Sequence, residues 1–111
     1  MPSFFKDPPP VRSKTLREAY RLIPCQWEGC GIDDSTVACA HSNFTQYGGK
    51  GGARKASDNF GASLCSVHHF QLDQGNRLSY EERRDGWHAA HLRSVELLTK
   101  RGLWPKGVPL P

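Results

Sequence analysis

Two close-spaced pairs of metal-ligating side chains constrain this chain more than any other feature. Four residues separate Cys25 from Cys30, and two residues separate Cys65 from His68. Each pair stands at an expected turn, and a turn presents both members of a pair on the same side. Thiolate and neutral imidazole are ligands of tetrahedral zinc, so the spacing predicts one structural zinc site of the Cys₃His type. The alternative is a set of buried free thiols, a common state of intracellular cysteine.

The composition indicates a small domain with a modest core, in which such a cross-link is plausible. The chain has 111 residues, of which 37% are hydrophobic, and a formal charge of +4. A domain of this length buries only about two-thirds of its unfolded surface. No apolar run approaches the roughly 18 residues of a membrane span, and no apolar signal segment precedes Pro8. We therefore expect a cytoplasmic protein without membrane contact, with thiols or metal ligands in place of disulfides.

The local patterns predict one α+β domain over residues 15–105. A basic, Pro-rich arm over 1–14 precedes it, and a flexible tail over 106–111 follows. Capping-box patterns at Thr15 and Ser79 predict the starts of two helices. The expected elements are a short helix at 16–22, strands at 36–41 and 60–64, a helix at 66–74 and a long helix at 80–101.

The long helix has one face that we expect to lie mostly in the core. That face carries Tyr80, Arg84, Trp87, His91, Val95 and Leu98 at helical spacing. His88 is expected at the surface, whereas Trp27 and Trp104 are expected to pack like Trp87. Cys39 has no close-spaced partner, so we interpret it as a core thiol.

Two further groups of side chains suggest contact with a phosphate and a metal ion. A Gly-rich loop follows Phe44 and carries Lys50, Arg54 and Lys55 without an acidic residue among them, which suits phosphate binding as well as a solvated loop. His69 and Asp73 stand four apart, so on a helix they share one face and could bind an ion together. Arg17, in a basic segment around the first helix, is a further candidate for contact with a nucleic-acid strand.

In combination, these motifs resemble those of the HNH nucleases. The resemblance rests on Cys-x₄-Cys from Cys25, on Ala40-His41 at a strand end, on the Gly-rich basic loop before Asp58-Asn59, and on Leu64-Cys65-x-x-His68-His69. It covers about residues 14–78 and is strongest to the small YbcO-like group of phage and prophage proteins. HNH enzymes are endonucleases with a ββα-metal fold, in which two short strands and a helix surround one catalytic cation. The resemblance therefore implies a zinc-stapled ββα-metal core between a short N-terminal and a long C-terminal helix.

The resemblance also implies a role for each matching residue. His41 stands at the position of the general base that activates water, and Asp58 or Asn59 stands near the family's asparagine. His69 and Asp73 stand where the family binds its catalytic divalent ion, Mg²⁺ or Mn²⁺ for an oxygen-rich shell, with Zn²⁺ or Ni²⁺ also admitted by imidazole. The chain departs from the family at Ala40, where many members have a metal-ligating Asp or His.

The sequence leaves three functions open. The first is a metal-dependent DNA endonuclease of phage or prophage type that hydrolyses phosphodiester bonds, on single-stranded, duplex or branched DNA. The second is a non-catalytic, zinc-stabilised nucleic-acid-binding module, which the missing ligand at Ala40 favours. The third is a protein-interaction adaptor built around the long helix. The apolar surface of this helix would suit a homodimer, so the sequence leaves monomer and homodimer open.

Overall fold

A computed structural model describes residues 10–44 and 56–111 as a small α+β domain. Two antiparallel strands and three helices make up the described fold, as the sequence predicts. In chain order they are α1 (Lys14–Tyr20), β1 (Ala38–His41), β2 (Gly61–Leu64), α2 (Ser66–Asp73) and α3 (Tyr80–Lys100).

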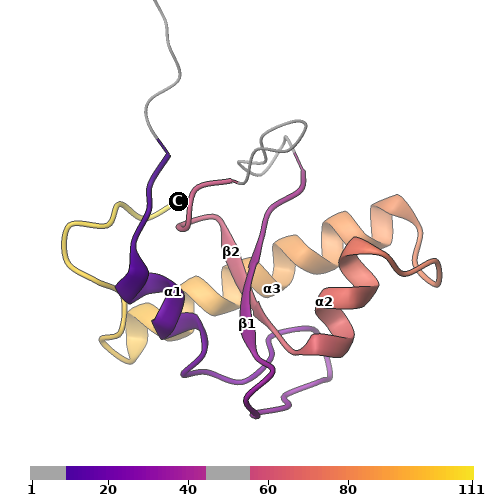
Figure 1. Cartoon of the computed structure of the whole chain (residues 1–111), viewed down its shortest axis with the longest axis horizontal. Coiled ribbons are helices and arrows are strands. Elements are labelled where there is room, and N and C mark those ends of the chain that lie inside the picture. The colour runs from indigo at the N-terminus through magenta and orange to yellow at the C-terminus, as the bar shows by residue number, and fades with distance from the viewer. Residues whose placement is uncertain (1–9, 45–55) are drawn as a thin grey trace, which may run out of the picture.

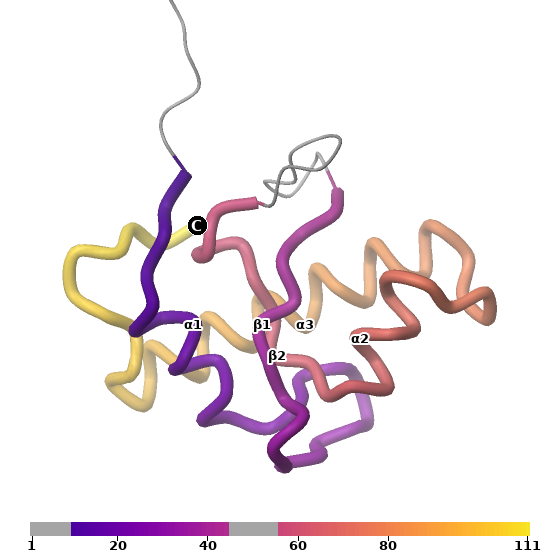
Figure 2. Tube along the Cα trace, in the orientation of Figure 1, coloured from indigo at the N-terminus to yellow at the C-terminus, as the bar shows by residue number. Residues whose placement is uncertain are grey.

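The two strands form a hairpin that lies between the helices. Ala38 pairs with Leu64 at one end of the ladder, and His41 pairs with Gly61 at the other. In Figures 1 and 2, α1 lies on one side of this hairpin, α2 follows β2 on the other side, and α3 runs behind both. Chain segments that are distant in sequence therefore meet around only eight strand residues, four in each strand.

Side chains alternate across the hairpin and contribute to two separate hydrophobic clusters. On one side, Ala40 packs in a cluster with Leu72 of α2 and Trp87 of α3. Cys39, the preceding strand residue, packs against the other cluster, which Tyr20 of α1 and its neighbours form with the end of α3. Because successive residues of a strand point to opposite faces, His41 lies on the side of Cys39.

The helix starts show how the local sequence determines the elements. Ser79 caps α3 through a reciprocal capping box with Glu82, as predicted. The prediction for the first helix was wrong in its cap, because α1 begins two residues early with Ser13 as its N-cap. The Ser13 hydroxyl accepts from the backbone N–H of Leu16, a bond that Thr15 cannot make from inside the helix.

The long helix buries a narrower face than its spacing predicts. Trp87, His91 and Leu98 are buried as expected, whereas Tyr80 is exposed. Arg84 and Val95 are only partly buried, and Ala90 and Ser94 complete the buried face. Tyr80 stays exposed at the first turn of α3 although its ring contacts Phe44 edge-on, with ring centroids 5.7 Å apart.

The last six residues contain no helix or strand, but specific contacts hold them against the domain. The Trp104 indole N–H donates to Val108 O at 2.9 Å, and the Asn59 side-chain amide donates to Pro109 O at 3.0 Å. Val108 also packs against the cluster around Tyr20. A segment that we expected to be a flexible tail thus returns to the loop that precedes β2 (Figure 2).

Candidate functional site

The four predicted zinc ligands converge in the structure. The ligand atoms of Cys25, Cys30, Cys65 and His68 all lie within 4.8 Å of one another. Cys30 Sγ is 3.9 Å from Cys65 Sγ, and His68 Nδ1 is 3.4 Å from Cys65 Sγ and 3.6 Å from Cys25 Sγ. A tetrahedral zinc ion requires two sulfurs about 3.8 Å apart and a sulfur and a nitrogen about 3.5 Å apart. The donor set and its spacing therefore fit a structural metal such as zinc.

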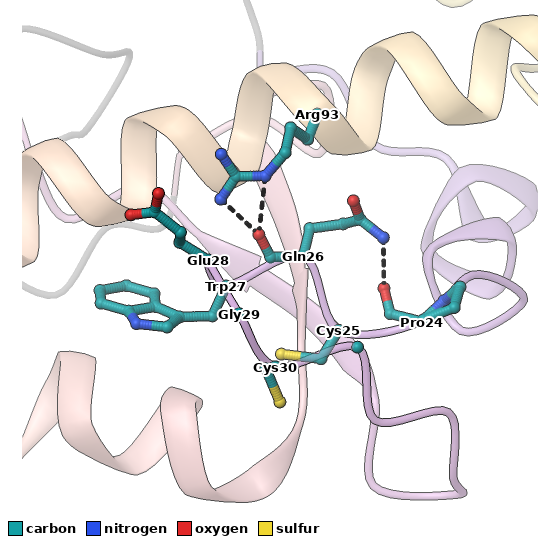
Figure 3. A pocket seen from close by; sticks show the side chains of 9 residues that line it. Pro24, Cys25, Gln26, Trp27, Glu28, Gly29, Cys30 and Arg93 are labelled. Atoms are coloured by element: carbon teal, nitrogen blue, oxygen red, sulfur yellow. Dashed lines mark hydrogen bonds between the residues drawn. The ribbon is translucent and has the colours of Figure 1, made fainter.

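A tight turn holds the first ligand pair in place. Cys30 N–H donates to Trp27 O at 2.9 Å, and the turn passes through Gly29 at φ +80°, a left-handed conformation that favours glycine. The Arg93 guanidinium of α3 reaches across and donates twice to Gln26 O, at 2.6 and 3.0 Å (Figure 3). The turn that presents the two thiols is thus fastened to the longest helix of the domain.

The second ligand pair belongs to the start of α2. Cys65 is the N-cap residue of that helix, and His68 lies in its first turn. The Trp27 indole stacks on the His68 imidazole, with ring centroids 5.4 Å apart and planes 11° apart. Gly86 of α3 makes room for this indole, since a Cβ at that position would collide with the Trp27 ring. The packing predicted for Trp27 is therefore packing against a candidate ligand.

Burial changes the acidity of the clustered groups. Burial raises the pKa of the Cys25 thiol to about 12 and lowers the pKa of His68. Burial also works to raise the pKa of Cys65, but the backbone N–H of His68 and the neighbouring thiols hold it below its ordinary value. A metal ion requires thiolates and neutral imidazole, so binding displaces the Cys25 proton that burial otherwise retains.

A second polar centre joins His41 to Asp58. His41 Nε2 lies 2.8 Å from Asp58 Oδ1, and the Asp58 side chain is only 1% exposed. Arg17 donates to Asp58 Oδ2 at 2.6 Å, and the backbone N–H of Ser13 donates to the same oxygen at 2.7 Å. Arg12 completes the shell at 3.7 Å from Oδ1. A buried carboxylate with this many donors is compensated without a metal ion.

This shell determines the charge of Asp58. Burial alone would raise the pKa of its carboxyl, but hydrogen bonds from His41, Ser13 and Arg17 together lower it. Asp58 is therefore ionised over the whole neutral range. With Asp58 accepting the N–H of His41 Nε2, the lone pair of the imidazole lies on Nδ1.

His41 opens onto a hollow of about 610 Å³ beside α1. Its side chain is 16% exposed, and Cys39 Sγ lies 3.9 Å from its Nδ1. The residues that line this hollow are Lys14, Arg17, Glu18, Arg21, Ala38, Cys39 and His41. Three cations and one carboxylate thus surround the imidazole, an arrangement that attracts anions.

His69 and Asp73 lie together on α2, as their spacing predicts. His69 Nε2 is 3.4 Å from Asp73 Oδ2, and both side chains are partly exposed. Asn43 donates from its side-chain amide to Asp73 Oδ1 at 2.9 Å. The donor set of one imidazole and one carboxylate suits a divalent ion that keeps most of its ligands as water.

This pair and His41 belong to different elements, α2 and β1. Ala40 lies on the hairpin face that packs against α2, whereas His41 lies on the opposite face, toward α1. Among the described residues, the Cys₃His set is the only group of three or more His, Cys, Asp or Glu side chains with ligand atoms this close. That His41 acts together with an ion on His69 and Asp73 therefore stays a prediction.

Other predicted site residues have different surroundings from those expected. Asn59 is buried and holds the C-terminal segment through Pro109, so its amide does not reach into the hollow of His41. Arg17 uses one guanidinium nitrogen on Asp58 and keeps 43% of its side chain exposed, so its contact with a nucleic acid stays a prediction. Lys50, Arg54 and Lys55 lie outside the described residues.

Asp58, the partner of His41, is also bound by residues that none of the sequence motifs includes. Ser13 supplies a backbone donor and Arg12 an ion pair, both to Asp58. The Val11 backbone N–H donates to the Ser57 hydroxyl, and the Val11 carbonyl accepts from the backbone N–H of Asp58. These two bonds hold the segment before α1 beside the carboxylate. The run Val11-Arg12-Ser13 carries the relevant signal, a helix cap preceded by a cation, but the sequence does not show which carboxylate it meets.

Comparison of the whole chain with protein-family models, curated proteins and solved structures finds no match. Within residues 10–44 and 56–111, no helix has both the length and the apolar character that crossing a membrane requires. The class of protein that the fold and site define is thus a small α+β domain with a Cys₃His cluster that could hold a metal.

Proposed function

We propose that this chain is a DNA endonuclease of the HNH type, with His41 as its general base. The observation that carries the proposal is the His41–Asp58 pair, whose imidazole opens onto a hollow lined by Lys14, Arg17 and Arg21. The resemblance of the motifs to those of phage and prophage HNH nucleases supports DNA as the substrate. The +4 formal charge of the chain is consistent with a polyanionic partner.

The chemistry follows from the orientation of the imidazole. A phosphodiester drawn to the three cations would lie against the hollow, where His41 Nδ1 can take a proton from an attacking water. The Asp58 carboxylate, held ionised by its donors, stabilises the imidazolium that results. Arg17 lies beside both groups and can offset the negative charge that develops on the phosphate oxygens.

A divalent cation is part of the proposal, and His69 and Asp73 are the residues that would hold it. When bound, such an ion supplies Lewis acidity toward a phosphate oxygen and the leaving 3′ oxygen. His69 and Asp73 would supply two ligands from partly exposed positions on α2. The chain's own contribution to proton transfer is therefore confined to His41 and Asp58.

Cleavage of labelled DNA tests the proposal. Zinc-loaded protein, freed of excess metal, is incubated with single-stranded, duplex and branched DNA and with Mg²⁺, Mn²⁺ or Ni²⁺. We expect ion-dependent cutting that His41→Gln lowers by about 100-fold or more, the usual contribution of a general base. His88→Gln, the same change at a histidine of α3 that is partly buried rather than at the surface as expected, is the matched control and should cut like the wild type. Cutting by His41→Gln at the wild-type rate would refute the assigned mechanism.

A second function is favoured by a specific observation and has its own outcome. Ala40 packs into the core, and among the described residues the Cys₃His set is the only group of three or more clustered metal-ligating side chains. A zinc-stabilised module that binds nucleic acid without cutting it would have this arrangement. Retention of DNA at low salt, with no cleavage under any of the ions, would support this function in place of the nuclease.

A further inference from the structure

Cys39 lies in line with the two residues of the candidate catalytic pair. Its Sγ is 3.9 Å from His41 Nδ1, and His41 Nε2 is 2.8 Å from Asp58 Oδ1. A thiol, an imidazole and a carboxylate in this order make the arrangement by which enzymes activate a sulfur nucleophile. Cys39 is partly exposed and lines the hollow beside α1, so a small reagent can reach it.

The strand positions fix this alignment. Cys39 and His41 are two residues apart in β1, so both side chains leave the same face of the hairpin. Gly61, which pairs with His41, leaves space for the sulfur, because a Cβ at that position would collide with Cys39 Sγ and with the Tyr20 ring. A glycine in a strand is thus explained by the room that the thiol occupies.

We propose that Cys39 is a reactive thiol that attacks small anionic disulfides, with His41 as its base. Cys39 Sγ attacks one sulfur of the disulfide and forms a mixed disulfide, while the other sulfur leaves as a thiolate with its electron pair. His41 Nδ1 takes the thiol proton, and Asp58 stabilises the imidazolium. Anionic disulfides are selected because Lys14, Arg17 and Arg21 outnumber Glu18 around the hollow.

Three other thiols of the chain differ from Cys39 in their surroundings. Cys25 and Cys65 are buried, and both lie with Cys30 in the Cys₃His cluster, where a bound metal would protect them. Among the described residues, the other charged or titratable groups near Cys39 and His41 come from α1, from its C-cap and from the loop before β2. They are Lys14, Arg17, Glu18, Tyr20, Arg21 and Asp58.

The proposal does not rest on the nuclease function, although both use the same lone pair. A thiol proton on His41 Nδ1 leaves no base for water, so thiol attack and hydrolysis exclude one another at any moment. A group attached to Cys39 would also stand between the hollow and Nδ1, given the 3.9 Å separation. Where the nuclease function holds, modification of Cys39 would therefore switch it off.

The rate of mixed-disulfide formation in zinc-loaded, DNA-free protein tests the inference. The protein is treated near neutral pH with dithiobis(nitrobenzoate), an anionic disulfide, and with neutral dithiodipyridine, and the modified residue is located by peptide mass analysis. We expect Cys39 to be modified first, about tenfold faster than a free cysteine. The anionic reagent should lose its advantage over the neutral one as salt is raised.

Two variants distinguish activation by His41 from simple accessibility. His41→Gln keeps a polar group beside Asp58 but lacks a base, and we expect it to slow modification of Cys39 by about tenfold or more. His88→Gln should leave the rate unchanged, and circular dichroism checks that both variants fold. Equal rates in His41→Gln and the wild type, or modification of Cys25, Cys30 or Cys65 before Cys39, would overturn the inference. Neither result depends on whether the protein cuts DNA.

Discussion

The Cys₃His cluster and the His41–Asp58 centre both join distant segments of a small chain, but they do so by opposite means. In the cluster, three thiols and one imidazole lie close enough together to hold a common metal ion. In the His41–Asp58 centre, the carboxylate already accepts from Ser13, Arg17 and His41, so it is satisfied by the chain itself. We therefore expect the first region to depend on a bound metal for its stability, and the second to depend on the placement of α1.

Of the substitutions that test this contrast, removal of one cluster ligand should lower the stability of the protein most. Cys65→Ala leaves too few donors for a structural zinc, and such ions contribute about 10–16 kcal/mol in zinc-finger peptides, as much as the whole stability of a small domain. We expect loss of one zinc ion per chain and loss of cooperative thermal unfolding, measured by metal analysis and circular dichroism.

Cys39→Ala is the matched control for this substitution, since it removes a thiol outside the cluster. It should keep the zinc and the cooperative transition. If Cys65→Ala unfolds at the wild-type temperature, the four residues are ordinary core side chains and the contrast between the two regions fails.

Neutralising the carboxylate should have the second largest effect. Asp58→Asn removes the negative charge that pairs with Arg17 and Arg12, at a side chain that is 1% exposed. Breaking a fully buried pair costs about 3–5 kcal/mol, and because both arginines are 43% exposed we expect about 2–3 kcal/mol here. Chemical denaturation measures the loss, and Asp85→Asn, which removes an exposed carboxylate paired with the partly buried Arg84, should leave stability nearly unchanged.

The stability difference between the wild type and Asp58→Asn should depend on pH. Hydrogen bonds lower the pKa of Asp58 in the folded state below its unfolded value of about 3.9. The stabilisation is therefore complete above the unfolded pKa and is lost as the pH falls through the folded pKa. The wild type should lose its advantage over Asp58→Asn in acid, and an advantage that persists unchanged far below pH 4 would contradict this assignment.

His91 tests whether the buried side of the hairpin tolerates a positive charge. His91 Nδ1 lies 2.7 Å from Gly61 O, its ring stacks on Trp87, and burial lowers its pKa. Its stabilising contribution is complete above the unfolded pKa of about 6.5 and decreases as the pH falls toward the folded value, by about 1.4 kcal/mol for each unit between them. The titration of its ring protons by NMR should have a midpoint below 6.5, and a midpoint above that value would show that the site admits the cation.

Local patterns predicted the cluster and most of the elements, because the information lies within a few residues. The close spacing within each ligand pair predicts the cluster, and Ser79 with Glu82 predicts the start of α3. The cap of α1 was assigned wrongly because Ser13 and Thr15 are both suitable cap residues. A long-range contact favours Ser13, because its backbone N–H donates to Asp58, 45 positions away in the sequence.

The position of His41 was harder to predict for a related reason. The sequence singles out His41, His69 and Asp73, but the face on which each lies depends on the register of a four-residue strand. A shift by one residue exchanges the two faces of the hairpin. The structure's register gives the α2 side to Ala40, and this separation follows from tertiary packing rather than from any local pattern.

Ser13 gives the smallest and most selective test, because its two polar groups serve different ends. Its hydroxyl caps α1 at Leu16, whereas its backbone N–H holds Asp58 Oδ2. Ser13→Ala removes only the cap and should cost about 1 kcal/mol, as should Ser79→Ala at the capping box of α3. Because the cap fixes the backbone that the carboxylate uses, we expect Ser13→Ala and Asp58→Asn to be coupled by at least about 0.5 kcal/mol in a double-mutant cycle, while Ser79→Ala and Asp58→Asn add independently. Additive costs for the first pair would mean that Asp58 is held by its side-chain partners alone, and that α1 contributes charge to the site without positioning it.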